Sequence, residues 1–459
     1  MAVTKGTITA LAEPGTVEAP VTLRADGCVV TPGFIDLHSH ADFAIEDHPA
    51  ADSALYQGVT TLLTGNCGFS PFPAPDRTVA RRAAGFLDRA GVSWDWTDFD
   101  GYARAVQATG PAINIAGQAG HSALRAAAVG LEDRPATPAE LDRMRSLLAE
   151  AAEQGAHGFS TGLIYAPGAY GDAAEVTALA TVAAEHGLLY STHMRNESGR
   201  LLEAVAEALE TARRSGVRLE ISHLKAMGPA NHGLVRDALR MIKEARAGGV
   251  DVTADVYPYT ASSTTLTSRL PGWAMDGGTP RLLERLADPA DRKRIVAEVR
   301  ERMGRDVDPA GVVIAALPPG PFSGDVAEVL AHPLVSVASD GWTLRPTGED
   351  RPHPRSFGTF VRVLGGYVRK RGLLDLAEAV RKMTSLPASR MGMTDRGVLR
   401  PGAVADVAVF DPAAVAEEAT FGEPYRLATG VRHVLVGGEA ALRAGASTGA
   451  RNGVVPRAR

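Results

Sequence analysis

Short apolar runs alternate with amphipathic helical stretches along most of the chain. Eight of these runs, rich in Val, Ile, Leu and Thr, are predicted to be strands: residues 33–38, 59–64, 112–117, 156–160, 188–193, 218–223, 250–256 and 334–339. They are mostly continuous rather than alternating in hydrophobicity, which is typical of strands buried on both faces of a parallel sheet. Helical patterns such as PAELDRMRSLLAEAAEQG separate consecutive runs and end in glycine, a common helix stop. The pattern predicts an α/β fold, a (β/α)8 TIM barrel, over an open doubly wound sheet.

Two parts of the chain lie outside this rhythm. Residues 1–31 and about 395–459 contain short strand-like runs with Gly and Pro turns, and we expect them to form one small β-sandwich domain built from both termini, around a barrel at 32–394. Residues 261–330 separate the last two predicted strands by far more than an ordinary loop. Because PRLLERLADPADRKRIVAEVRERM in this stretch has a helical pattern, we predict a folded insertion before the last barrel strand; whether it acts as a lid stays open.

Composition and charge exclude several classes of protein. The 459 residues are 45% hydrophobic and 22% charged, as expected for a globular enzyme. The net charge of −5, without a basic block, gives no support for a nucleic-acid or anionic-membrane partner. Two cysteines exclude a disulfide framework, and no apolar run approaches the roughly 18 residues of a membrane span. With no basic-then-apolar signal segment at its start, we expect a soluble cytoplasmic protein that acts on a small molecule; the oligomeric state is not predicted.

Residues able to bind a metal stand at the C-terminal ends of five of the predicted strands. They are His38, His40, Cys67, His193, His223 and Asp340. In a (β/α)8 barrel the active site lies at the C-terminal ends of the strands. His38 and His40 are expected on the same side of their strand, because side chains alternate. Thiolate, imidazole and carboxylate all bind zinc, and a set of Cys67, His193 and His223 leaves the fourth position open, as in catalytic zinc sites.

Each of these residues also has an ordinary structural explanation. A single His-X-His in a strand is more often packing than metal binding, a lone buried cysteine is usually a small apolar filler, and a lone aspartate at a strand end is often a helix N-cap. For all of these residues to be structural, such explanations would have to apply independently at the C-terminal ends of five predicted strands. The shared placement therefore favours a metal site, and Cys28 and the other histidines are interpreted as surface, packing or supporting groups.

The motifs around these residues resemble a known family. GFIDLHSHAD, followed by GVTTLLTGNCGFSP, is similar to the amidohydrolase superfamily, and specifically to its N-acyl-D-amino-acid deacylases (D-aminoacylases). The pattern continues through GFSTGLIYAPG, STHMRNE, EISHLKA, DVTADVYPYTASST, ASDG and HPRSFGTFVRVLG, so the resemblance covers nearly the whole chain. It implies an amidohydrolase-type barrel in which Cys67, His193 and His223 hold one zinc ion tightly. It also implies a second, weaker metal site near His38, His40, Cys67 and Asp340.

One sequence feature separates this branch from its relatives. In hydantoinases and dihydroorotases, as the resemblance to the superfamily implies, a modified lysine on the fourth strand bridges two metals. Here that strand reads GAHGFSTGL, and the chain has no lysine between Lys5 and Lys225. Cys67 is the expected substitute, so the resemblance favours hydrolysis of a linear N-acyl amino acid over that of a cyclic amide.

Asp340 is the candidate catalytic base. A carboxylate at hydrogen-bond distance can take a proton from water and hand it to a leaving amine, and a helix N-cap is the alternative role for this residue. Cationic and hydroxyl groups near the strand ends are candidates for binding the substrate carboxylate, partly by family resemblance: Lys225, Tyr257, Ser262, Ser263 and either Arg351 or Arg355. Asn66, Asn196 and Glu197 are candidates for orienting the metal ligands, with packing or capping as equal alternatives.

The sequence therefore predicts zinc-dependent hydrolysis of the amide bond of N-acyl-D-amino acids to a carboxylate and a free D-amino acid. The preference for the D enantiomer rests on the resemblance alone. One alternative is a zinc amidohydrolase that acts on another N-acyl or cyclic amide. The other is a non-catalytic scaffold, which the complete set of candidate ligands, together with a candidate base, argues against.

Overall fold

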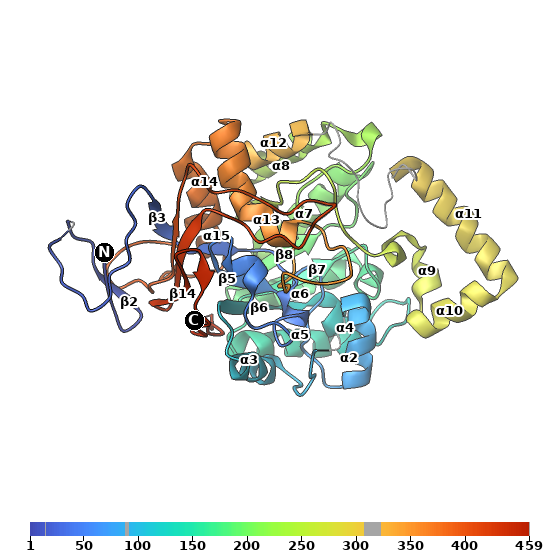
Figure 1. Cartoon of the computed structure of the whole chain (residues 1–459). Helices are drawn as coiled ribbons and strands as arrows, with labels where there is room; N and C mark the ends of the chain where they lie inside the picture. The colour runs from blue at the N-terminus through green and yellow to red at the C-terminus, as the bar shows by residue number, and fades with distance from the viewer. Residues whose placement is uncertain (14, 88–90, 307–322, 459) are drawn as a thin grey trace. The chain divides into compact units, whose positions relative to one another are not determined.

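The computed structural model describes residues 1–13, 15–87, 91–306 and 323–458. Its main sheet has eight strands in chain order. These strands are β4 Phe34–Asp36, β5 Val59–Thr64, β6 Asn114–Gly120, β7 Gly158–Gly162, β8 Leu189–His193, β9 Arg218–Ile221, β10 Val252–Val256 and β11 Val335–Val337. Of these, β5, β6, β7 and β8 are labelled in Figure 1. The pairs β4–β5, β6–β7, β7–β8, β8–β9 and β9–β10 are parallel. Each predicted run overlaps one of these strands, although β6 and β7 extend beyond the predicted C-terminal ends, and the predicted barrel class is confirmed.

Helices follow most of the barrel strands. They are α1 Asp52–Leu55, α2 Arg77–Ala84, α3 Phe99–Ala108, α4 His121–Ala128, α5 Pro138–Glu153, α6 Ala173–Glu185, α7 Leu201–Ser215, α8 Leu234–Ala247, α9 Gly272–Met275, α10 Thr279–Ala287, α11 Pro289–Asp306, α12 Ser323–Ala331, α13 Arg355–Arg362, α14 Leu376–Met383 and α15 Ser385–Arg390. A capping box between Thr137 and Glu140 begins α5, and Gly216 in the left-handed conformation ends α7. Local sequence therefore fixes the ends of these two crossover helices.

Burial on both faces explains the continuous apolar pattern of the barrel strands. Every residue of β5, β6, β7, β8 and β10 is buried. Some of the buried side chains are polar and bond to one another. Gln118 Nε2 donates to Asn66 Oδ1 at 3.0 Å, and Ser191 Oγ donates to Gln118 Oε1 at 3.1 Å. The predicted orienting residue Asn66 is therefore part of a buried polar network.

Contacts divide the chain into two compact units, which are described separately. Unit 1 contains residues 1–64, 104–116 and 335–458, and unit 2 contains residues 65–103 and 117–334. The predicted domain boundaries, near residues 31 and 395, stay predictions.

In unit 1, the last barrel strand returns to the first. Ser39, just after β4, forms a parallel bridge with Gly341, just after β11. The main-chain N–H of His40 donates to Gly341 O, and that of Asp340 donates to His38 O, both at 2.8 Å. These bonds close the strand order from β11 to β4, as a barrel requires. They also hold the backbone that carries two histidines beside the backbone that carries Asp340.

Strands from both ends of the chain share a second, antiparallel sheet in unit 1. Its order is β15-β14-β13-β12-β3, with β3 at Val29–Pro32. The other members are β12 Val407–Phe410, β13 Val431–Val436, β14 Glu439–Arg443 and β15 Ala446–Ser447. A separate two-stranded sheet pairs β1 Ala2–Thr4 with β2 Thr7–Ala10. The predicted use of both termini in one sheet is thus observed.

The segment between β10 and β11 is largely helical where it is described. It contains α9, α10, α11 and α12, and Ala274, Leu282 and Ile295 form a small buried cluster of their own. Part of the predicted insertion, 307–322, lies outside the described residues. None of the helices in the described ranges is long and apolar enough to cross a membrane.

Candidate metal centre

Three predicted zinc ligands converge in unit 2. Cys67 lies in the turn after β5, His193 ends β8, and His223 follows β9. The Cys67 Sγ lies 3.7 Å from His193 Nδ1 and 3.6 Å from His223 Nε2, and the three donor atoms lie within 4.8 Å of one another. Tetrahedral zinc coordination, with Zn–S of about 2.3 Å and Zn–N of about 2.0 Å, separates sulfur from nitrogen by about 3.6 Å. The donor types and their spacing therefore fit zinc.

The turn that carries Cys67 is tight and closely packed. Cys67 has a φ of 54°, in the left-handed region, and Gly65 and Gly68 on either side have φ values of 81° and 77°. Gly162, the last residue of β7, packs against this turn, so that a Cβ at position 162 would overlap the Cys67 carbonyl oxygen. The GNCG motif and Gly162 together place the thiol beside the two imidazoles.

We expect Gly162→Ala to displace the Cys67 turn and to lower the free energy of unfolding by about 1–3 kcal/mol, the usual scale of overpacking. Zinc binding should weaken as well, because the thiol moves relative to the imidazoles. Denaturant unfolding and chelator competition measure the two effects. Gly324→Ala, in α12, is the control, because its new Cβ meets nothing within 4 Å. Wild-type values for Gly162→Ala would contradict the close packing.

Glu197 contacts the outer nitrogens of both imidazoles. Its Oε1 lies 2.9 Å from His223 Nδ1, and its Oε2 lies 3.4 Å from His193 Nε2. Lys225 Nζ donates to the same Oε1 at 2.7 Å and to His223 O at 3.1 Å. Burial alone would raise the pKa of Glu197, but His193, Lys225 and His223 hold this pKa well below its usual range. The carboxylate is therefore ionised at neutral pH.

The pKa values of the two imidazoles are shifted in opposite directions. Burial lowers the pKa of His193, which keeps its imidazole neutral, the form that binds metals. Burial and the Lys225 ammonium also act to lower the pKa of His223, but Glu197 and Cys67 outweigh them and raise it. The Glu197 carboxylate thus supplies negative charge to this cluster.

Tyr165 covers His193, a contact that the sequence did not reveal. Tyr165 lies three residues beyond β7, and its ring meets the His193 ring edge-on with centroids 5.0 Å apart. Its hydroxyl lies 2.9 Å from Thr264 Oγ1, in the segment after β10. The position of Tyr165 shortly after a strand was the one sequence feature that could have indicated this contact. Because the residue is aromatic and uncharged, the sequence offered no further reason to select it.

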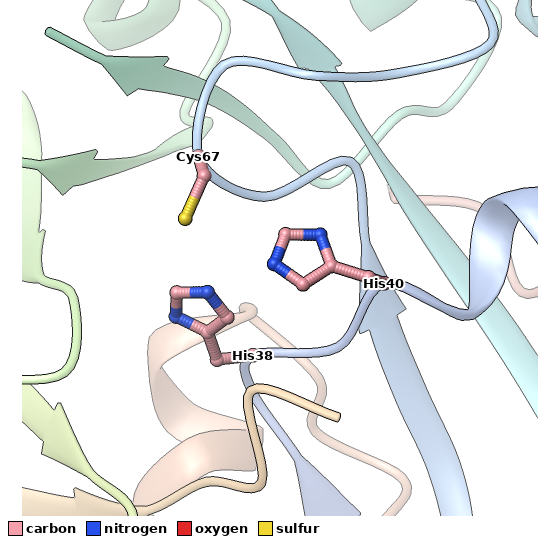
Figure 2. A group of neighbouring side chains, drawn as sticks. All are labelled: His38, His40 and Cys67. Carbon is pink, nitrogen blue, oxygen red and sulfur yellow. The ribbon is translucent and has the colours of Figure 1, made fainter. Parts of the chain in front are cut away.

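A second cluster in unit 1 gathers the other predicted ligands. Figure 2 shows His38 and His40 on the segment after β4. Asp340 Oδ1 lies 3.4 Å from His38 Nε2 and 3.1 Å from His40 Nε2. Arg355 forms an ion pair with the other oxygen, Asp340 Oδ2, at 2.7 Å. All four side chains of this unit 1 cluster are buried.

Asp36 joins the backbone segments that carry this cluster. Its Oδ1 accepts the main-chain N–H of His38 at 3.2 Å and that of Ser339 at 2.9 Å, and the Ser339 hydroxyl donates to Oδ2. Burial raises the pKa of Asp36 to about 6, against the opposing effect of these hydrogen bonds. Asp36 therefore ties the end of β4 to the end of β11. Sequence reasoning did not select it, although it lies two residues before His38.

Three predicted ligands share an uncommon backbone conformation. Cys67, His223 and Asp340 have φ values of 54°, 38° and 50°. Non-glycine residues in this region are strained and cluster at functional sites, where the surrounding structure maintains them. The strain supports a functional rather than a packing role for these three residues.

The other predicted residues differ in their surroundings. Ser262 and Ser263 are exposed in the segment after β10, and Arg351 is exposed in the segment after β11. The ring of Tyr257 lies 6.4 Å from that of His223, and Lys225 Nζ lies 5.7 Å from the Tyr257 ring centroid. The structure thus brings Lys225 and Tyr257 to the unit 2 cluster.

Asn196 has a turn-forming role. Its Oδ1 accepts the main-chain N–H of Ser198 at 2.9 Å and that of Arg200 at 3.0 Å. These bonds shape the segment between β8 and α7, which also carries Glu197. Asn196 therefore supports the cluster through the backbone rather than by contact with a ligand.

The sequence matches the amidohydrolase family over residues 22–299 and 302–441. It is 40% identical over 440 residues to an N-acyl-D-glutamate deacylase of Alcaligenes xylosoxydans xylosoxydans, covering 94% of this chain and 87% of the relative. It is 37% identical over 455 residues to a D-aminoacylase of the same organism, covering 98% and 91%. These relatives align along nearly their whole length.

A solved structure is similar over the same extent. It is the N-acyl-D-glutamate deacylase of Bordetella bronchiseptica, complexed with zinc and a phosphonate inhibitor that mimics the tetrahedral intermediate of its reaction. The TM-score is 0.83 at 38% sequence identity, with 99% of this chain and 94% of that one covered. Both sequence and fold therefore connect this chain to proteins named as deacylases.

Proposed function

Because the chain belongs to the amidohydrolase family, we propose that it is a zinc-dependent enzyme that hydrolyses the amide bond of N-acyl-D-amino acids. The products are a carboxylate and a free D-amino acid. The observation that carries this proposal is the Cys67, His193 and His223 cluster, whose donor spacing fits tetrahedral zinc. The names of its relatives, deacylases of N-acyl-D-amino acids, supply the substrate class.

In this proposal the chain's residues have separate tasks. Cys67, His193 and His223 would hold a tightly bound zinc, and we propose a second, weaker site near His38, His40, Cys67 and Asp340. Bound at the first site, zinc supplies Lewis-acid polarisation of the scissile carbonyl and a lower pKa for the attacking water. Asp340 takes the proton from that water and delivers it to the nitrogen of the leaving amine as the C–N bond breaks.

Arg351 and Arg355 are alternative candidates for binding the substrate carboxylate, and their surroundings distinguish them. Arg355 is buried in an ion pair with Asp340, which favours a role in holding the base. Arg351 is exposed four residues earlier, which leaves it the better candidate for a substrate carboxylate. Lys225 and Tyr257, beside His223, are proposed to bind the same group, and Ser262 and Ser263 remain candidates on the segment after β10.

A different amide substrate is the second candidate. A cyclic amide is disfavoured because β7 reads GFSTG, without the lysine expected in cyclic amidohydrolases. At the end of β7, Gly162 packs against the Cys67 turn. A linear amide with another acyl or amino-acid part is not disfavoured by these residues.

The proposal is tested by hydrolysis of N-acetyl-D-glutamate, N-acetyl-D-aspartate and N-acetyl-D-methionine, each beside its L enantiomer. Zinc-loaded protein is compared with metal-stripped and zinc-reconstituted protein, and the released amino group is quantified. We expect zinc-dependent release from at least one D substrate and none from the L forms. Release from L substrates would overturn the stereochemistry. No release from any of the six would move the function to another amide.

A further inference from the structure

Glu197 lies behind both histidine ligands, on the side away from the thiol. It stands between β8 and α7, four residues after His193. Each carboxylate oxygen faces one imidazole: Oε1 faces His223 Nδ1 at 2.9 Å, and Oε2 faces His193 Nε2 at 3.4 Å. The remaining ring nitrogens, His193 Nδ1 and His223 Nε2, face Cys67 Sγ. One carboxylate therefore lies beside the outer nitrogen of each ring. The contact with His193 Nε2 does not have hydrogen-bond geometry, and Lys225 Nζ also lies 2.9 Å from His223 Nδ1.

We propose that Glu197 is the positioning residue of the metal centre: its two oxygens accept the outer N–H groups of His193 and His223 and thereby present His193 Nδ1 and His223 Nε2 to the metal. This inference rests on the proposed zinc site. A metal-bound histidine usually donates its other N–H to a carboxylate or carbonyl, which fixes the tautomer and the ring orientation. Because one carboxylate serves two rings here, the orientations of the two ligands depend on each other.

Glu197 also fixes Lys225. The Lys225 ammonium donates to Glu197 Oε1 at 2.7 Å, and its distance to the Tyr257 ring centroid is 5.7 Å. A buried carboxylate is costly unless it is paired, and Lys225 together with the two imidazoles provides that pairing. The residue thus connects metal retention to the placement of a cation proposed to bind substrate. A simple structural ion pair between Glu197 and Lys225 would not make this connection.

The two explanations predict different behaviour for the two partners. If Glu197 positions the ligands, Glu197→Gln weakens zinc binding, because an amide oxygen can accept from one imidazole while its NH2 group opposes the other N–H. Lys225→Met then raises KM but leaves zinc affinity near that of the wild type. If the pair is only structural, removing either partner alters zinc affinity to the same extent.

The experiment measures zinc affinity of the full chain by competition with a chromophoric chelator, in the absence of substrate. We expect Glu197→Gln to bind zinc about 10–100-fold more weakly than the wild type, and to shift the absorption bands of the cobalt-substituted protein. Glu207→Gln is the matched control, because it loses an ion pair with Arg195 at 3.1 Å outside the metal centre. If Glu197→Gln does not fold, Glu197→Asp replaces it, since the shorter carboxylate cannot reach both rings equally.

The outcomes separate this inference from the proposed function. Wild-type zinc affinity and an unchanged cobalt spectrum in the Glu197 variants overturn the inference. Equal loss of affinity in Glu197→Gln and Lys225→Met also overturns it in favour of a structural pair. Failure to hydrolyse any N-acyl amino acid, with tight zinc binding that depends on Glu197, overturns the proposed function alone. Weak zinc binding by the wild-type chain overturns both.

Discussion

Replacing Cys67 with alanine is expected to abolish tight zinc binding and to lower kcat/KM by about 10⁴-fold or more, the scale seen when a member of a catalytic unit is removed. The thiol is the one sulfur donor of the unit 2 cluster and lies 3.6–3.7 Å from both imidazole nitrogens. Without it, two histidines remain, and two ligands are too few for a stable catalytic zinc site. Metal analysis after exhaustive dialysis, together with steady-state kinetics, measures both losses.

Cys28→Ala is the matched control for this substitution. Cys28 is the other cysteine of the chain, it is half-buried, and it lies outside both clusters. We expect this variant to keep the zinc content and kcat/KM of the wild type. A Cys67→Ala protein that retains full activity with stoichiometric zinc would remove Cys67 from the proposed ligand set.

Asp340→Asn is expected to retain the tightly bound zinc and to lose about 10²–10⁴-fold in kcat, the usual contribution of a general base. The amide cannot accept the proton of the attacking water, whereas Cys67, His193 and His223 are untouched. Zinc content and kcat, measured on the same preparation, give the two quantities. The exposed Arg351→Met variant serves for comparison: its effect is expected in KM, because it is proposed to bind the substrate carboxylate.

The ion pair between Arg355 and Asp340 helps to interpret the Asp340 variant. Its guanidinium pairs with Asp340 Oδ2, while Oδ1 faces His38 and His40. The carboxylate therefore has a partner that orients it and two imidazoles with which it can share a metal. Loss of the tightly bound zinc in Asp340→Asn would make Asp340 chiefly a ligand and would leave the base unassigned.

Much of the metal centre was readable from the order of residue types along the chain. In a parallel barrel the side chains that follow each strand reach the same rim, so a histidine or cysteine at a strand end is informative even when its partners lie far away in sequence. This reasoning selected Cys67, His193 and His223, which the structure brings together. The eight strands themselves were predicted because burial on both faces produces continuous apolar runs.

Contacts between supporting residues were not readable in the same way. Arg355 was selected as a candidate for substrate, but it pairs with Asp340. Tyr165 and Asp36 were not selected, although one covers His193 and the other joins the ends of β4 and β11. Charge, aromatic character and position in a loop are compatible with many roles, and the partner decides among them.

The sequence by itself determined the barrel class, the approximate strand positions and the chemical types of the candidate ligands, because apolar periodicity and position after a strand are local properties of the chain. Only the tertiary structure decided which nitrogen of each imidazole faces the thiol and which faces Glu197. It also decided the strained backbone at Cys67, which depends on Gly162 from another strand. These features depend on distances of a few ångströms between segments that are in some cases more than a hundred residues apart. Side-chain packing sets such distances, and the order of residues along any one segment does not.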